Sequence, residues 1–219
     1  MTVLHDLKET SMTRRLLVEP LCVAAALLGL FSATTAEAAS TPTIVAMVNP
    51  VDQYQVLKPS WTVLHRFYGG TCNEGSGAGI PGADRCFVSN TIYDPCWPTV
   101  NQYDRYNGSF CPSAPWSHSG ILIKGHHHPY NDATGRSVWG IALPSGNRCS
   151  FVGGAGTLYR GKRVNFGCQH DSIWLVGRPN KTTRIWHILA VQYDKNFRVV
   201  RHWTAEIRRA WVARSPYGG

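Results

Sequence analysis

The cysteines are the residues of this 219-residue chain whose chemistry is best defined by their number and spacing. One of the seven, Cys22, lies within an apolar N-terminal segment, and six follow it. An even number of cysteines in an exported chain predicts a disulfide framework, for which six residues allow fifteen pairings. Neighbours along the chain enclose short loops rich in turn residues. We therefore predict the pairs Cys72–Cys86, Cys96–Cys111 and Cys149–Cys168.

A tract of three consecutive histidines is the candidate metal site. Side chains alternate between the two faces of an extended segment, so only His126 and His128 can share a side. Zinc needs a third or fourth ligand, for which His118 or Asp132 is available in the sequence. The alternative is an exposed loop that binds divalent transition metals weakly.

The sequence offers no strong catalytic motif. It has no G-x-S-x-G elbow, and it has no free thiol if the disulfides form. Asp171 and Glu206 could serve as the two carboxylates of a glycan hydrolase, and His170 or His187 as bases, but their spacing does not single them out. We therefore expect a non-enzymatic protein without a cofactor, with a secreted hydrolase acting on glycan or peptide as the alternative.

Positive charge is concentrated in the C-terminal half. Residues 39–115 hold four Lys/Arg and five Asp/Glu, whereas residues 116–219 hold fifteen Lys/Arg and four Asp/Glu. Such a field attracts anionic polymers and surfaces. A basic surface that is only solvated, without a dedicated partner, explains the same charge. If there is a partner, we expect an anionic component of the cell envelope, because export disfavours nucleic acid. The candidate anion-binding residues are Arg198, Arg201, Arg208 and Arg209.

The N-terminal segment 1–38 has the pattern of a signal peptide. Arg14 and Arg15 precede eleven apolar residues, 21–31, and a small-x-small pattern ends at Ala38. Eleven residues are too few to cross a hydrocarbon core of ~30 Å as a helix. Acidic and polar residues before Met12 suggest that translation starts there. We expect a secreted protein, extracellular or attached to the envelope, whose mature chain has no transmembrane segment.

The remaining chain is expected to be mostly β, a small antiparallel sandwich or barrel with a loop-rich N-terminal subregion held by disulfides. Residues 39–60 form a tail or a first strand, and residues 61–219 a single β domain. Within this domain, residues 69–115 are rich in Cys, Gly and Pro and are expected to form loops. From residue 116 on, short apolar runs alternate with turn residues about every ten positions. A helix over Thr204–Val212 is the competing interpretation of its last part.

Two segments carry a resemblance to known proteins. The pattern R-C-x3-N-x-I-x-D-P-C spans Arg85 to Cys96, with Arg85 as a charge partner for Asp94. Further on, residues 139–143, 146–151, 153–155 and 163–168 form a second set of motifs. Together they resemble a family of small secreted actinobacterial proteins without an assigned function, over residues 70–212. The resemblance implies export and supports the cysteine pairing, but it implies no activity. The chain departs from the family pattern at Asn73 and Glu74, where the family has an aromatic residue.

Overall fold

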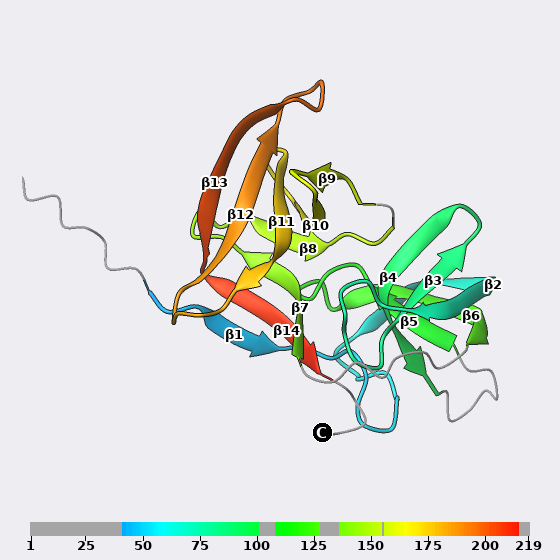
Figure 1. Ribbon diagram of the computed structural model, residues 1–219. Coiled ribbons are helices and arrows are strands. Elements are labelled where there is room, and N and C mark those ends of the chain that lie inside the picture. The colour runs from blue at the N-terminus through cyan, green and yellow to red at the C-terminus, as the bar shows by residue number, and fades with distance from the viewer. Residues whose placement is uncertain (1–40, 101–107, 128–135, 155, 215–219) are drawn as a thin grey trace, which may run out of the picture. The chain divides into compact units, whose positions relative to one another are not determined.

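The computed structural model describes residues 41–100, 108–127, 136–154 and 156–214 (Figure 1). The predicted signal peptide, with Met12, therefore lies outside the described residues, as do His128 and Asp132. The described residues form fourteen strands and no helix, which confirms the prediction of a mostly β protein. They belong to one compact unit that extends from Ala39 to Gly219.

The first β structure is a closed barrel of five strands, ordered β2-β3-β4-β5-β6. Neighbouring strands are antiparallel except that β2 and β6 close the barrel in parallel. The strands are β2 (Thr62–Gly75), β3 (Asp84–Val88), β4 (Thr91–Thr99), β5 (Gly108–Pro112) and β6 (Ser119–His127). The sequence predicted loops for residues 69–115. Much of this segment instead forms strands: the end of β2, then β3, β4 and β5.

Disulfides take much of the place of a hydrophobic core inside this barrel. Cys72–Cys86 joins paired positions of β2 and β3, and Cys96–Cys111 joins β4 to β5. All four cysteines are buried in one cluster with Ile123 of β6. The paired strands β2 and β6 approach closely at a shift in their register: a Cβ atom on Gly125 would lie 2.2 Å from the carbonyl oxygen of Gly70. Only glycine allows the two backbones to approach this closely.

The second β structure is a sheet of nine strands that curls on itself. Its order is β1-β14-β7-β8-β10-β11-β12-β13, and β9 pairs with β10 at its side. The strands are β1 (Ile44–Met47), β7 (Arg136–Ala142), β8 (Arg148–Phe151), β9 (Leu158–Tyr159), β10 (Lys162–Cys168), β11 (Ile173–Asn180), β12 (Trp186–Tyr193), β13 (Val199–Ile207) and β14 (Arg209–Arg214).

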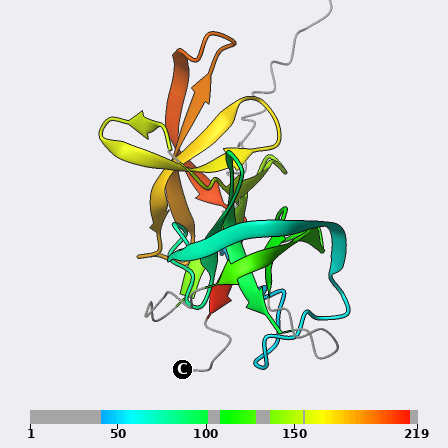
Figure 2. The ribbon, with the colours of Figure 1, turned by 90° about the vertical axis from the view of Figure 1, so that its right-hand side faces the viewer.

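The curl comes from one bent segment near the C-terminus. Residues 199–207 pair with β12, the chain bends at Arg208, and residues 209–214 pair with β7. The N–H of Arg208 donates to the carbonyl of Ala142 at 2.9 Å, which fixes the bend. Thr204–Val212 is thus extended rather than helical (Figure 2). Both faces of β14 are buried.

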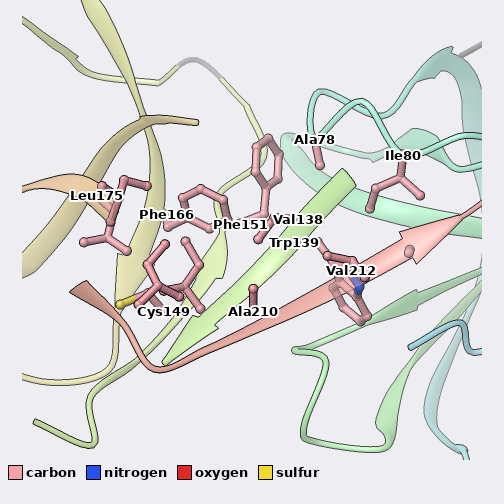
Figure 3. Packing of buried hydrophobic residues seen from close by; sticks show 14 of the residues in the cluster. Ala78, Ile80, Val138, Trp139, Cys149, Phe151, Phe166, Leu175, Ala210 and Val212 are labelled. Carbon is pink, nitrogen blue, oxygen red and sulfur yellow. The ribbon is translucent and has the colours of Figure 1, made fainter. Parts of the chain in front are cut away.

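The larger hydrophobic cluster of the sheet includes two residues of the barrel strands, Trp97 and Phe110. The ring centroids of Trp97 and Trp139 of β7 lie 5.1 Å apart, and both rings are fully buried. Figure 3 shows the phenylalanines Phe151 and Phe166 between Leu175 on one side and Val138 on the other. The cluster therefore contains residues from both β structures.

Cys149–Cys168 is the one disulfide of the sheet in the described residues, and it joins paired positions of β8 and β10. The three bonds are the neighbouring pairs that the spacing predicts. The described residues also contain no helix long and apolar enough to cross a membrane.

Removing the disulfide of the sheet should destabilise the protein measurably. A cross-link between residues 19 apart contributes about 3 kcal/mol in the chain-entropy account. We expect the double variant Cys149→Ala/Cys168→Ala to lose about this much free energy of unfolding in urea titrations of the oxidised protein. Ser150→Ala on the same strand is the control and should change little. An oxidised double variant as stable as the wild type would show that the bond does not form.

Candidate functional site

The four arginines predicted to bind anions fall into two groups. Arg198 and Arg201 lie on the hairpin that joins β12 to β13, and both are exposed. Arg208 and Arg209 lie at the bend between β13 and β14. Arg208 follows Arg201 by seven positions of extended chain, a distance of roughly 23 Å at ~3.3 Å per residue. The predicted cluster is therefore two separate surfaces.

The turn of the β12–β13 hairpin is held by one carboxylate. Oδ1 of Asp194 accepts hydrogen bonds from the backbone N–H groups of Asn196 and Arg198, each at 2.8 Å. The backbone N–H of Asp194 also donates a hydrogen bond to the carbonyl of Arg198 at 2.9 Å. Within this turn Phe197 has a φ of 59°, in the left-handed region that a bulky side chain rarely adopts. The turn conformation is thus specified by the Asp194 side chain.

This turn exposes apolar side chains to solvent. Phe197 is 79% exposed and Val200 59%, and Val199 is also exposed. Lys195, Arg198 and Arg201 are exposed beside them. We call residues 195–201 the hairpin face; in Figure 2 the orange turn that carries it stands clear of the neighbouring strands.

A second hairpin adds positive charge next to the hairpin face. The ring of Tyr159 at the β9–β10 turn lies 6.1 Å from the ring of His202 on β13. It also belongs to the same small cluster as Tyr193, where β12 ends. The guanidinium of Arg160 stacks over Tyr159 at 5.4 Å and is exposed. Arg160 therefore extends the basic surface that begins on the β12–β13 hairpin.

The exposed apolar side chains of this surface are not among the site residues that the sequence predicts. Phe197 is the last residue of the turn that precedes β13. The signal was present in the sequence, because an aromatic residue directly follows the turn residues Asp194-Lys195-Asn196.

The residues considered for hydrolysis do not converge. His187 on β12 is paired with Glu206 on β13. Asp171 lies in the exposed turn before β11, where its carbonyl accepts a hydrogen bond from the amide of Gln192 at 3.1 Å. Five residues of β12 separate His187 from Gln192, roughly 16 Å. Asp171 and Glu206 are therefore not placed as a catalytic pair.

The predicted metal ligands that lie in the described residues are also not close together. Strand β6 ends at His127, and the side chains of His126 and His128 lie outside the described residues. His118 precedes the other end of β6, where its ring lies 5.0 Å from that of Trp61. In the described part of the chain, the sulfurs of Cys86, Cys96 and Cys111 lie close enough together for a metal. Disulfide bonding removes the thiolates that would bind it.

The R-C-x3-N-x-I-x-D-P-C segment forms a buried polar centre at the side of the barrel. The side chain of Asp94 is inaccessible to solvent. It accepts hydrogen bonds from Ser76 Oγ at 2.5 Å, from the N–H of Gly77 at 2.9 Å and from Arg85 Nε at 3.2 Å. Arg85 also contacts Glu74 at 3.2 Å. The expected ion pair between Arg85 and Asp94 is thus confirmed.

The second set of resemblance motifs packs against this centre. A Cβ atom on Gly153 would lie 2.8 Å from Cβ of Asp94, so a side chain is excluded there. Arg163 holds the same loop by donating to the carbonyls of Val152 at 3.0 Å and Gly154 at 2.9 Å. Its Nη1 also lies 3.2 Å from where a Cβ on Gly77 would be. The two sets of motifs therefore form one structural contact between barrel and sheet.

Burial raises the pKa of Asp94 above its ordinary value, against the lowering effect of its hydrogen bonds and of the Arg85 charge. The folded protein thus holds the Asp94 proton more tightly than the unfolded chain does. This contribution to stability is complete below pH 3.8 and is lost as the pH rises through the folded-state pKa.

Comparisons with models of known families, with curated proteins and with solved structures found no match to this chain. The resemblance to secreted actinobacterial proteins stays a prediction.

The titration of Asp94 provides a test of this buried centre. Asp94→Asn keeps one acceptor oxygen but does not titrate, so the variant should be less stable than the wild type. The difference in unfolding free energy should be largest at acidic pH and should shrink as the pH rises from 3.8. Urea titrations at a series of pH values measure it. A difference that grows with pH would mean that the folded-state pKa is lowered instead.

Proposed function

We propose that this protein is a secreted, non-enzymatic domain that binds an anionic lipid surface of the cell envelope through the hairpin face. The observation that carries the proposal is the combination of exposed apolar and basic side chains on one turn, residues 195–201. Three disulfides support an address outside the cytoplasm, where such bonds persist.

The charges of this region favour a negative partner. Lys195, Arg198, Arg201 and Arg160 are exposed, and none of them forms an ion pair with a carboxylate of the described residues. The Asp194 carboxylate accepts backbone hydrogen bonds of its own turn. Each Lys or Arg near an anionic membrane surface contributes about 1 kcal/mol to binding.

The apolar side chains favour a lipid surface over a soluble polymer. Phe197 and Val200 gain free energy by leaving water for the interfacial region of a bilayer, about 1.5–3 kcal/mol for a fully buried side chain of this kind. A charged polymer provides no such apolar environment. The Asp194 hydrogen bonds fix the turn before binding, so little conformational entropy is lost when Phe197 inserts.

The apolar contribution can be tested with vesicles of phosphatidylcholine with and without phosphatidylglycerol. The protein without residues 1–38 should sediment with the vesicles that contain phosphatidylglycerol. It should sediment much less with vesicles of phosphatidylcholine alone. Phe197→Ala should weaken binding about tenfold. Tyr54→Ala is the matched control, because Tyr54 is also an exposed aromatic residue and lies outside the hairpin face. Equal effects of the two variants would contradict the proposal.

The two groups of arginines allow a second, charge-matched comparison. Arg198→Gln/Arg201→Gln should weaken binding to the same vesicles about thirtyfold, the equivalent of ~2 kcal/mol. Arg208→Gln/Arg209→Gln removes the same charge at the bend of β13 and should have a much smaller effect. Binding should also fall as salt is raised. If the protein bound an isolated anionic polymer of the envelope but not the vesicles, the partner would be that polymer and the lipid proposal would be wrong.

A further inference from the structure

A cavity of about 120 Å³ lies where strands β7, β8, β10 and β11 face the connection between β2 and β3. Among the residues that the structure describes, three basic side chains line it, Arg136, Arg178 and Lys181, and no acidic one does. Its other walls include the apolar side chains of Val138, Phe151 and Phe166. Figure 3 shows these three side chains, with Ala78 of the β2–β3 connection nearby. The cavity is thus positively charged on one side and apolar on the other.

The β2–β3 connection fixes the position of one of the cations. Ser137 Oγ on β7 donates a hydrogen bond to the carbonyl of Gly79 at 2.5 Å, which holds the connection against the sheet. Gly79 has a φ of 66°, and a Cβ atom there would lie 3.1 Å from Nη2 of Arg178. The guanidinium therefore rests against a glycine, with no side chain between them.

The positive charge of the cavity is not neutralised within the described residues, where neither Arg178 nor Lys181 forms an ion pair with a carboxylate. Burial, and secondarily the charge of Arg178, lower the pKa of Lys181. The Lys181 ammonium also stacks over the Trp186 ring at 5.0 Å. Arg178 and Lys181 are both exposed to solvent, and the charge of Arg178 acts on Lys181. Two neighbouring cations that line one cavity form a site at which an anion is stabilised.

We propose that this cavity binds a small organic acid, whose carboxylate contacts Arg178 and Lys181 and whose apolar body packs against the two phenylalanines. The rings of Phe151 and Phe166 meet edge to face, with centroids 5.9 Å apart. A cavity of ~150 Å³ is known to hold benzene, so a cavity of about 120 Å³ suits a single ring or a short branched chain. The site is separate from the hairpin face and does not depend on the function proposed for it.

Benzoate is the probe for this site, and isothermal titration calorimetry on the oxidised protein measures its binding. Arg178→Gln and Lys181→Gln should each weaken benzoate binding about tenfold, the loss of one charge-assisted contact. Arg184→Gln is the matched control, because Arg184 is exposed close to Lys181 in the chain and does not line the cavity. It should bind benzoate as the wild type does.

Two further probes separate the two halves of the site. Benzyl alcohol has the ring without the charge, and inorganic phosphate has charge without the ring; both should bind at least tenfold more weakly than benzoate. If phosphate bound as tightly as benzoate, the cavity would recognise charge alone, which would overturn the proposal. Absence of benzoate binding, or equal loss in all three variants, would also overturn it. Phe197→Ala should leave benzoate binding unchanged, which keeps this result independent of the vesicle experiments.

Discussion

The buried carboxylate of Asp94 is the interaction on which the arrangement of the two β structures depends. It is inaccessible to water and accepts hydrogen bonds from Ser76 and Gly77 of the β2–β3 connection and from Arg85 of β3. The loop at Gly153 packs directly on it from the sheet. An unpaired buried carboxylate would be costly, so each of these partners has to be in place when the chain folds. The β2–β3 connection, which begins at Ser76, also forms one wall of the basic cavity.

Much of the fold could be predicted from local sequence patterns. Turn residues about every ten positions located the strands of the sheet, because hairpins require them. The disulfide pairs followed from neighbouring cysteines, since hairpin strands place such residues opposite one another. The strands within residues 69–115 were harder to predict, because glycine is found both in turns and where two backbones approach closely. Gly70 and Gly125 are an example of the second case. Closure of the barrel depends on the parallel pairing of β2 with β6, which no local pattern reveals.

The candidate site was only partly predictable for a related reason. The count of charges identified the basic half of the chain. It could not show that Arg198 and Arg201 lie on a different surface from Arg208 and Arg209, because the chain bends at Arg208. It also could not predict that Arg160 lies near the β12–β13 hairpin. That placement follows from the contact between the neighbouring Tyr159 and His202, which are far apart in the sequence. Lys181 and Arg178 meet Phe151 only across the sheet. The sequence therefore predicts the charge of a partner, and the fold shows which of the basic residues share one surface.

Hydrogen exchange read by mass spectrometry, with and without phosphatidylglycerol vesicles, tests the central claim most directly because it locates the contact without altering the protein. Membrane contact at the hairpin face should slow exchange in peptides covering residues 193–202 and 157–163, and leave peptides covering 208–214 unchanged. Unchanged exchange at both hairpins in the bound protein, or protection confined to the Arg208–Arg209 bend, would contradict the account.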